Sequence, residues 1–316
     1  MIPTTCINLS DQHSIALPTI GLGTYSILGG DGKEAIRTAI DVGYRMFDTA
    51  VAYGNEAIVG EAIREKIREC NNLTRDDFFI ISKLSGSYHR KDLVEKCCRM
   101  TLDRLGMDYV DLYLMHTPVA LQSEKKCARN GTKPNAIDDS IAPTEAWIGL
   151  EQCYQEGLCR SIGVSNFNEH QINALLSDAS IVPAVNQIEC SIGFNQRPMR
   201  KFCQQQNILV MGYTPLGKQK LPFLQNNRLK EIALSVDKTT AQVSLRYLLC
   251  FSFQIDEGVV PIVKSTDRKR QQENLDIFDF KLTKQQLEEL DAIGGDQRAC
   301  KMDFLAGAKH FPFTDC

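Results

Sequence analysis

The chain has 316 residues, a formal net charge of -3 and 24% charged residues. A balance this close to neutral gives no electrostatic reason to expect nucleic acid or an anionic membrane surface as a partner. No apolar run approaches the ~20 residues that span a bilayer, and the N-terminus lacks the basic and apolar regions of a secretory signal, so we expect a cytoplasmic protein.

The 12 cysteines are scattered along the chain rather than regularly spaced. Because no secretory signal is present, a disulfide framework is not expected, and we interpret most cysteines as small buried apolar residues. The sequence contains no Cys-x-x-Cys or His-x-x-x-His pair, so no metal site is predicted.

The first predicted element is a hairpin around Ser10-Asp11-Gln12, which would close the bottom of a barrel. Short apolar segments rich in β-branched residues follow it. Their nearly continuous apolar character is typical of strands that are buried on both faces of a parallel sheet. They cover residues 19–25, 45–50, 78–84, 110–116, 161–166, 183–189, 209–214 and 259–265.

Segments of helical period lie between these strands. Residues 55–70 place their apolar side chains on one stripe, with Asn55 as the expected N-cap and Glu56 in the first turn. The helix over 90–106 is predicted to end at Gly106. Further helices are predicted over residues 145–158, 168–178, 196–206 and 240–251.

This alternation predicts a closed (β/α)₈ barrel formed by residues 1–316 as one domain. The alternative is a doubly wound sheet, which would need a Gly-x-Gly-x-x-Gly turn after its first strand. "GLGTYS" breaks that pattern at Ser26. Two connections, 117–143 and the tail beyond Gly294, are longer than a barrel needs, and loops of this length are often functional lids.

Polar side chains end almost every predicted strand. Each alone is more often structural, because a strand-end aspartate commonly forms a turn and a histidine such as His116 commonly makes structural hydrogen bonds. In a barrel, however, the C-terminal ends of all strands converge on one site. The residues at these ends are Asp48, Lys83, His116, Ser165, Asn166, Gln187, Tyr213, Lys264 and Ser265.

Three long motifs resemble the signatures of the aldo-keto reductases: "GYRMFDTAVAYGNEAIVG" (43–60), "GLCRSIGVSNF" (157–167) and "IVKSTDRKRQQEN" (262–274). "ISKL" (81–84) and "DLYLMHTP" (111–118) match the intervening strands. The resemblance extends from the N-terminal hairpin to near Phe313. It implies a monomeric, NADPH-dependent carbonyl reductase of the aldose-reductase and hydroxysteroid-dehydrogenase branch.

The catalytic residues of that family map onto Asp48, Tyr53, Lys83 and His116. Hydride delivered to a carbonyl carbon leaves an alkoxide that needs a proton donor, and a tyrosine with a pKa of about 10 is a poor acid. We expect Lys83 to lower the pKa of Tyr53, Asp48 to keep the lysine charged, and His116 to orient the carbonyl. Relatives that reduce a steroid carbon–carbon double bond carry glutamate where this chain has His116, which favours carbonyl reduction.

The resemblance also assigns the cofactor contacts. Ser165, Asn166 and Gln187 suit a nicotinamide carboxamide, and Tyr213 suits stacking on the nicotinamide ring. Lys264, Ser265 and Arg270 suit the 2′-phosphate that distinguishes NADPH from NADH. The remaining expected contacts are Gly23, Thr24, Tyr25, Asp48, Leu216, Thr266, Glu273 and Asn274.

The expected substrate pocket lacks the tryptophans of aldose reductase, because the one tryptophan, Trp147, is interpreted as a packing residue. A roomier or more polar pocket would admit bulky ketones, and the loop after Tyr213 is shorter than in relatives that convert steroids. Cys300 lies where some relatives carry an oxidisable cysteine, and it is equally well a tail cysteine with no role. The pocket residues are Tyr25, Tyr53, Ser85, His116, Thr117 and Cys300.

Two alternatives to a general aldehyde or ketone reductase stay open. One is a hydroxysteroid or prostaglandin ketoreductase. The other is a non-enzymatic NADPH-binding protein, since some barrels of this family serve as channel-associated subunits or lens proteins and fold does not fix function. A damaged tetrad would have favoured the non-enzymatic protein, whereas the tetrad here is intact.

Overall fold

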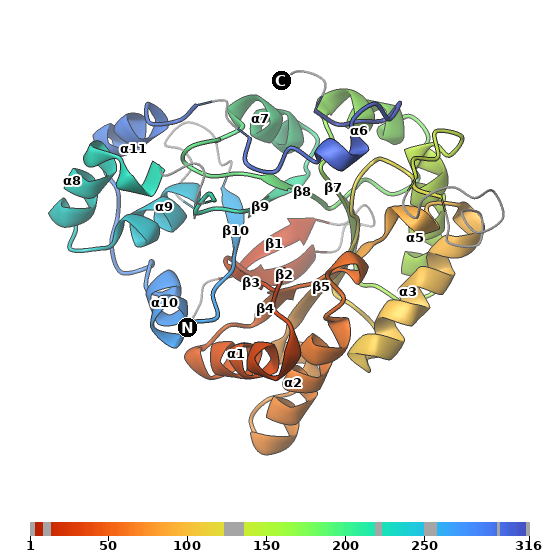
Figure 1. Cartoon of the computed structure of the whole chain (residues 1–316), viewed down its shortest axis with the longest axis horizontal. Coiled ribbons are helices and arrows are strands. Elements are labelled where there is room, and N and C mark those ends of the chain that lie inside the picture. The colour runs from red at the N-terminus through yellow and green to blue at the C-terminus, as the bar shows by residue number, and fades with distance from the viewer. Residues whose placement is uncertain are drawn as a thin grey trace.

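The computed structural model describes residues 4–8, 14–122, 136–218, 223–249, 258–295 and 298–313, with 4–8 and 14 described by their backbone alone. Parallel strands close into a barrel in the order β10-β3-β4-β5-β6-β7-β8-β9 (Figure 1). The (β/α)₈ prediction is therefore confirmed, and the doubly wound alternative is wrong. The strands are β3 Gly21–Gly23, β4 Met46–Asp48, β5 Phe79–Leu84, β6 Leu112–Met115, β7 Ile162–Ser165, β8 Val185–Glu189, β9 Leu209–Tyr213 and β10 Val259–Val263.

Helices surround the barrel and cover its outer face (Figure 1). Among the helices of the described ranges, none combines the length and apolar character needed to cross a bilayer. The third helix ends at Gly106 in the left-handed conformation, as predicted. The helices are α1 Gly29–Val42, α2 Glu56–Glu69, α3 Lys91–Leu105, α5 Pro143–Gln155, α6 Glu169–Leu176, α7 Arg197–Gln205, α8 Asn227–Ser235, α9 Thr240–Leu249, α10 Arg268–Leu275 and α11 Lys284–Asp291.

The N-terminal hairpin lies outside the ring of strands. β1 (Thr4–Asn8) pairs antiparallel with β2 (Ser14–Pro18), while the turn at 10–12 falls outside the described residues. In Figure 1 the hairpin is visible through the barrel, at its far end. Leu17 of β2 is fully buried among side chains that fill the barrel interior, such as Met46 and Leu112. The expected plug at the bottom of the barrel is therefore confirmed.

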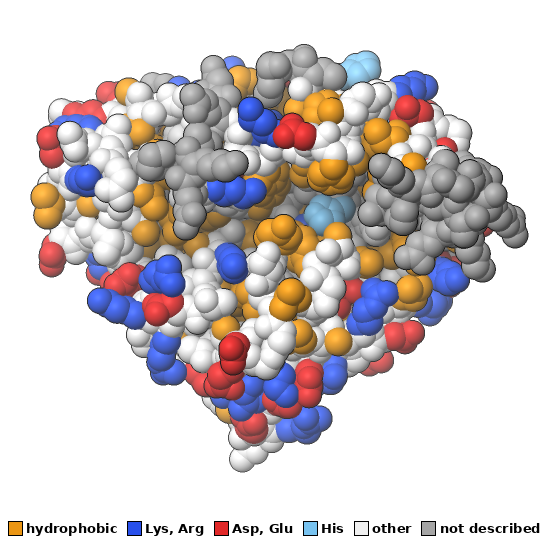
Figure 2. All heavy atoms as spheres, in the orientation of Figure 1, with side chains coloured by type: hydrophobic (Ala, Val, Ile, Leu, Met, Phe, Trp, Pro, Cys, Tyr) orange, Lys and Arg blue, Asp and Glu red, His pale blue; other side chains and the backbone are white. Residues whose placement is uncertain are grey.

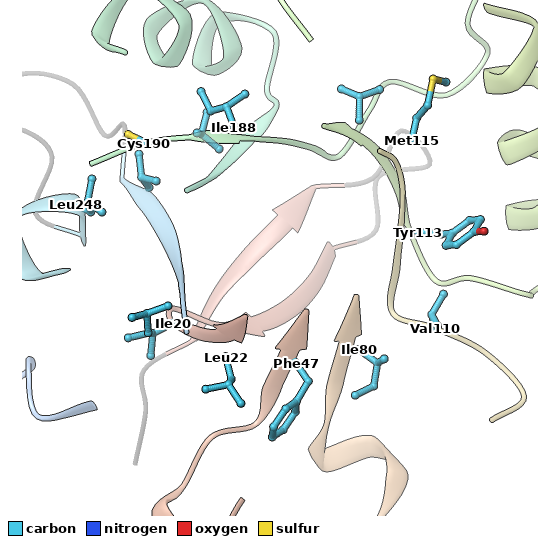
Figure 3. Close-up of a cluster of buried hydrophobic side chains, with 14 of the residues drawn as sticks. Ile20, Leu22, Phe47, Ile80, Val110, Tyr113, Met115, Ile188, Cys190 and Leu248 are labelled. Carbon is cyan, nitrogen blue, oxygen red and sulfur yellow. The ribbon is translucent and has the colours of Figure 1, made fainter. Parts of the chain in front are cut away.

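A second apolar layer lies between the strands and the helices. Figure 3 shows residues such as Leu22, Phe47 and Ile80 directed outward from successive strands into this layer. Trp147 of α5 belongs to it, with 1% of its surface exposed and its indole nitrogen donating to the Ile181 carbonyl at 3.1 Å. The interpretation of Trp147 as a packing residue is confirmed. All cysteines described in the structure are free, so no disulfide contributes to this core.

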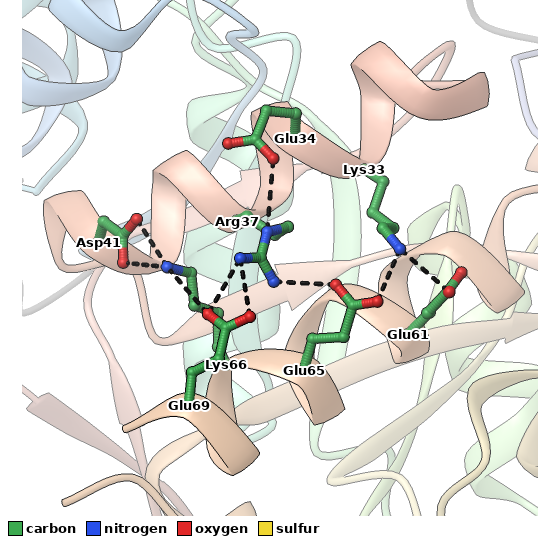
Figure 4. Close-up of polar contacts among 8 residues, drawn as sticks. All are labelled: Lys33, Glu34, Arg37, Asp41, Glu61, Glu65, Lys66 and Glu69. Carbon is green, nitrogen blue, oxygen red and sulfur yellow. Dashed lines mark hydrogen bonds and ion pairs between the residues drawn. The ribbon is translucent and has the colours of Figure 1, made fainter. Parts of the chain in front are cut away.

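An ion-pair ladder joins α1 to α2 on the outer surface (Figure 4). Arg37 contacts Glu65 at 2.8 Å and Glu69 at 2.9 Å, and Lys66 contacts Asp41 at 2.6 Å. The carboxylates are between 23% and 48% exposed, so water screens each pair and its contribution to stability is small. As a network, the ladder fixes the relative position of two helices whose N-terminal ends face the loops that follow β3 and β4.

Asn55 does not cap α2 as predicted, because its side chain makes no hydrogen bond to the first turn. Instead, its amide donates to the carbonyls of Thr24 at 2.7 Å and Ile27 at 3.0 Å, and its oxygen accepts from Thr49 at 2.7 Å. These carbonyls are buried and would be costly to leave without a donor. Asn55 therefore ties the loop after β3 to the loop after β4.

Candidate active site

A buried ion pair lies at the C-terminal end of two neighbouring strands. Lys83 of β5 donates to both oxygens of Asp48 on β4, at 2.6 and 2.7 Å, and to the Thr49 carbonyl at 3.0 Å. Lys83 is 1% exposed and Asp48 is 3% exposed. Burial lowers the pKa of Lys83, and the charge and hydrogen bonds of Asp48 oppose that effect. The structure thus places together the lysine and aspartate that the sequence predicts as partners.

Tyr53 ends a short 3₁₀ turn, η1 (Val51–Tyr53), that follows β4. Its hydroxyl lies 3.4 Å from Lys83 Nζ, within hydrogen-bonding reach. Burial raises the pKa of Tyr53 well above its ordinary value of about 10, and the negative charge of Asp48 adds to the increase.

The pKa of Tyr53 is therefore raised overall, which is opposite to the decrease expected from Lys83. Asp48 accepts two hydrogen bonds from the ammonium and largely balances its charge, so the effect of Lys83 does not outweigh the burial of the phenol. As a result, Tyr53 keeps its proton at neutral pH. That is the protonation state that a proton donor needs.

His116 faces Tyr53 from the end of β6. The two rings meet edge to face with their centroids 5.6 Å apart. Burial lowers the pKa of His116 to about 3, and the charges of Lys83 and His89 act in the same direction. The imidazole is therefore neutral at pH 7, with one N–H donor and one acceptor nitrogen. Lys83, Tyr53 and His116 meet at one point of the barrel mouth.

Side chains from three more strands form a continuous hydrogen-bonded chain beside this point. Tyr213 of β9 donates to the Asn166 oxygen at 2.7 Å, and the Asn166 amide donates to the His116 carbonyl at 2.9 Å. Ser165 donates to the Gln187 carbonyl at 2.8 Å, and the Gln187 amide donates to Asp48 at 2.8 Å. The bond between Gln187 and Asp48 was not predicted from the sequence, which assigns Gln187 to the nicotinamide.

The predicted phosphate cluster lies at the end of β10 and the start of α10. Lys264 and Arg270 are exposed, whereas Ser265 is 7% exposed and accepts from the Asp267 amide at 3.2 Å. No carboxylate of the described residues pairs with Lys264. An exposed ammonium without an ion pair, beside a hydroxyl, fits the phosphate group for which the sequence predicts it.

The other predicted cofactor residues differ in what they offer. Thr24 is fully buried, and its hydroxyl donates to the Asp48 carbonyl at 2.8 Å. This bond joins the loop after β3 to the end of β4. At Gly23 an added Cβ would lie 3.2 Å from Ile262, so only a small residue fits there. Of the others, Leu216 packs against the core, Asn274 is buried, Glu273 is partly exposed and Thr266 is exposed.

The predicted substrate residues border the same mouth. Tyr25 is 62% exposed and packs edge to face against Tyr53, with 5.2 Å between the ring centroids. Ser85 and Thr117 are partly exposed at the ends of β5 and β6. Cys300 lies with its sulfur 3.7 Å from the Thr214 hydroxyl, directly after β9, so the structure brings it to the site. Figure 2 shows a hollow on this face, with a histidine in its floor and Lys or Arg side chains on its rim.

Glu189 is a site residue that the sequence analysis missed. It ends β8, is 2% exposed, and accepts the backbone N–H groups of Ala299 at 2.7 Å and Cys300 at 2.8 Å. Its position at a strand end was a usable signal, because the other strand-end polar residues were selected on that basis. Glu189 holds the C-terminal segment over the mouth of the barrel.

The comparisons with known proteins agree with this geometry. The aldo/keto reductase family model matches residues 19–294. Aldo-keto reductase family 1 member C1 of Homo sapiens is 34% identical over 324 residues, covering 98% of each chain. Aldo-keto reductase family 1 member A1-A of Danio rerio is 37% identical over 330 residues, covering 99% of each chain.

Two solved structures resemble this one over nearly their whole length. The aldose reductase of Schistosoma japonicum superposes with a TM-score of 0.87 at 34% identity, covering 98% of this chain and 99% of that one. The aldo-keto reductase of Bombyx mori, solved in complex with NADP, superposes with a TM-score of 0.85 at 34% identity, covering 99% and 100%. The chain belongs to the aldo/keto reductase family.

Proposed function

We propose that this protein reduces aldehydes or ketones to alcohols with NADPH as the hydride source and Tyr53 as the proton donor. As a member of the aldo/keto reductase family it is an NADP-dependent oxidoreductase. The observation that carries the proposal is the meeting of a protonated phenol, a buried ammonium and a neutral imidazole at one point.

The nicotinamide cofactor, when bound, supplies the hydride. Asn166 and Tyr213, at the ends of β7 and β9, provide amide and aromatic groups suited to its nicotinamide end, as the family resemblance implies. Lys264 and Arg270 provide exposed cations for its phosphate end. Asn166, Tyr213 and Lys264 lie at the C-terminal ends of strands, on the same face as Tyr53, and Arg270 lies in the first turn of α10.

The chain's own residues carry the proton. Tyr53 holds it on the phenol oxygen, and the neutral His116 donates a hydrogen bond to the carbonyl oxygen, which polarises the bond and fixes its direction. As the proton leaves, the phenolate that forms is stabilised by Lys83 at 3.4 Å. Asp48 holds the ammonium in place throughout, and the Gln187 amide in turn donates to Asp48.

The test compares the unmodified protein with Tyr53→Phe on a panel of aldehydes, aldoses, quinones and ketosteroids, following the loss of nicotinamide absorbance. Because the phenol is the proton donor, we expect kcat to fall by roughly 10²–10⁴-fold. We expect the NADPH dissociation constant, measured by fluorescence titration, to stay unchanged. Preference for ketosteroids over aldehydes would select the hydroxysteroid reductase within the same mechanism.

Tyr109→Phe is the matched control, because the Tyr109 hydroxyl bonds Asp76 at the opposite end of the barrel and its loss should leave kcat unchanged. If Tyr53→Phe keeps its rate, another group donates the proton and the proposal fails. If the unmodified protein binds NADPH but turns over no compound of the panel, the non-enzymatic NADPH-binding protein replaces the reductase.

A further inference from the structure

Glu56 is a buried carboxylate at the first position of α2, outside the ring of strands. It is 1% exposed, and each of its oxygens accepts a hydrogen bond at 2.7 Å, one from the Ser82 hydroxyl and one from the Arg104 guanidinium. Ser82 belongs to β5 and Arg104 to α3, and α2 and α3 lie next to each other (Figure 1). Burying a charged carboxylate is costly even when it is paired, and the proposed mechanism does not use this one.

Contacts of Glu56 lead to both members of the Lys83–Tyr53 pair. Ser82 is fully buried and directly precedes Lys83 on β5. Because neighbouring residues of a strand point to opposite faces, the Ser82 hydroxyl reaches Glu56 outside the barrel while Lys83 points into the mouth. Tyr53 is joined to Glu56 by two intervening residues, which span at most about 11 Å. Glu56 therefore fixes the strand of the lysine relative to the turn that carries the tyrosine.

The charge of Glu56 also acts on Lys83 across the strand. Burial lowers the pKa of Lys83, and the charge and hydrogen bonds of Asp48 and the charge of Glu56 oppose that decrease. Glu56 lies at the N-terminus of α2, where the helix dipole favours a negative charge. The electrostatic effect thus agrees with the contacts in linking Glu56 to the lysine.

Inside the barrel, the Lys83–Tyr53 pair faces titratable groups from several elements. Asp48 of β4 contacts the ammonium directly. His116, after β6, is neutral at pH 7 because burial lowers its pKa to about 3. The other titratable groups that act on Tyr53 are Tyr25, Tyr213 and Cys300.

Outside the barrel, Glu56 faces titratable groups of α3 and of the turn before it. Arg104 is its ion-pair partner, and the Arg104 side chain is 37% exposed. Burial raises the pKa of the Cys97 thiol, so Cys97 is uncharged at pH 7. Tyr88 acts on Arg104 from the turn before α3. Changing Glu56 or Arg104 therefore changes the charge on the outer side of β5 and leaves the inner side as it is.

We propose that Glu56 is a positioning residue of the active site, which holds Lys83 and Tyr53 in place from outside the barrel and supplies a negative charge to the lysine. The proposal rests on the proposed function, because it assigns a further residue to the same site. Glu56 acts through Lys83 and does not touch the substrate.

The experiment follows single-turnover reduction by the full-length protein with bound NADPH, from about pH 6 to pH 11, using the carbonyl compound of the panel that is reduced fastest. The rate should fall at high pH with an apparent pKa that belongs to the Lys83–Tyr53 pair. In Glu56→Gln we expect this apparent pKa to fall by about 0.5–1 pH unit, because a negative charge that makes both protons harder to lose has been removed. The glutamine oxygen can still accept a hydrogen bond, so the rate below the transition should stay within about threefold.

Arg104→Gln makes the opposite change of charge. It leaves Glu56 ionised without its partner, so the apparent pKa should rise by a similar amount. A merely structural contact between α2 and α3 would be weakened in both variants and would not move the apparent pKa in opposite directions. Glu61→Gln is the matched control, because Glu61 is an exposed carboxylate of the same helix that pairs with Lys33.

An unchanged apparent pKa in Glu56→Gln overturns the proposal, and so does a shift in the same direction in Glu56→Gln and Arg104→Gln. A shift in Glu61→Gln as large as that in Glu56→Gln also overturns it, because overall charge would then explain the effect. Each of these outcomes leaves the reductase itself intact.

A titration of Lys83 tests the proposal even if no carbonyl compound is reduced, an outcome that would instead contradict the proposed function. NMR of protein containing lysine with ¹³C at its ε-carbon follows the ammonium, and Lys83→Met identifies its signal. The pKa of Lys83 should be lower in Glu56→Gln than in the unmodified protein and higher in Arg104→Gln. Equal values in the three proteins would contradict the role of Glu56.

Discussion

His89 is a buried imidazole that lies behind the active site and serves no catalytic role in the proposed mechanism. It is 1% exposed, and neither ring nitrogen has a hydrogen-bond partner among the described residues. Burial lowers its pKa to about 3, from an ordinary value of about 6.5. In the unfolded chain, the imidazole of His89 takes up a proton more readily than in the folded protein. The part of the free energy of unfolding that depends on His89 is therefore highest above pH 6.5 and is lost as the pH falls toward 3.

We predict that His89→Leu makes the protein less sensitive to acid. Between pH 7 and pH 5 the protonation of His89 in the unfolded state should remove roughly 2 kcal/mol from the free energy of unfolding, and the leucine variant should not lose this part. Urea unfolding at the two pH values measures the difference. His170→Leu, at an exposed position of α6, is the control, and equal pH slopes in His89→Leu and the unmodified protein would contradict the prediction.

Single residues of the site were largely predictable, but their titration was not. Asp48, Lys83 and His116 end strands, and the motifs around them supply Tyr53, so sequence alone selects them. The direction in which the pKa of Tyr53 moves depends on the depth of burial and on the pairing of Lys83 with Asp48. Neither is encoded in local sequence, because both arise when distant strands close into the barrel.

The C-terminal segment is held to the barrel by contacts from separate elements. Glu189 of β8 binds the backbone of Ala299 and Cys300. At the start of α6, Asn168 donates to the Pro312 carbonyl at 3.2 Å and Gln171 donates to the His310 carbonyl at 2.9 Å. Lys309 adds a further attachment, because its backbone N–H donates to Asp139 at 2.9 Å. Beside the mouth, the backbone of the segment is held by the carboxylate of Glu189.

We predict that Glu189→Ala releases the part of the segment beside the mouth. Loss of two charge-assisted hydrogen bonds should cost about 1.5–3 kcal/mol locally, so trypsin should cleave at Arg298 and Lys301 roughly tenfold faster. KM for carbonyl substrates should rise while NADPH affinity stays unchanged. Glu288→Ala on the exposed face of α11 is the control, and unchanged proteolysis of the Glu189 variant would contradict the anchoring role.

Strands and helices were predictable where the apolar periodicity was strong. Their first and last residues were less predictable, because tertiary contacts decide them. All eight strands form within the predicted segments, each shorter than predicted because the flanking residues enter turns. Asn55 has the right residue type for an N-cap, yet the buried carbonyls of the preceding loop use its amide. Such competition between a local cap and a distant partner is invisible in the sequence around α2.

The two ends of the barrel have separate roles. The bottom is closed by the hairpin, where Leu17 is fully buried against the interior side chains. The top carries the polar residues of the site at the strand ends. We therefore expect the packing of the hairpin at the bottom to affect stability and the polar residues at the top to affect catalysis, each independently of the other.

We predict that Leu17→Ala destabilises the whole molecule without changing its chemistry. The cavity left at the bottom should cost about 2–5 kcal/mol, measured by urea unfolding. Well below the unfolding transition, KM and kcat should match those of the unmodified protein. Leu234→Ala is the control, because Leu234 is 81% exposed, and an altered KM in Leu17→Ala would show that the two ends are coupled.

The barrel itself was predictable from the alternation of strands and helices, because βα units that repeat along a chain bury their apolar faces in few ways. The substrate was not predictable to the same degree. Its pocket is bordered by loops, and Thr214 and Cys300 meet there only because segments far apart in the sequence fold over one mouth.

The hydrogen bond from Gln187 to Asp48 joins β8 to β4, which lie directly opposite each other in the ring of strands. Gln187, Asp48 and Lys83 form a polar layer across the barrel. Below this layer, the interior is filled by apolar side chains down to Leu17. The barrel interior is consequently closed at the bottom and open only at the top. In the proposed mechanism, the proton that Tyr53 gives up therefore has no route from below and is replaced through the same opening that admits the substrate.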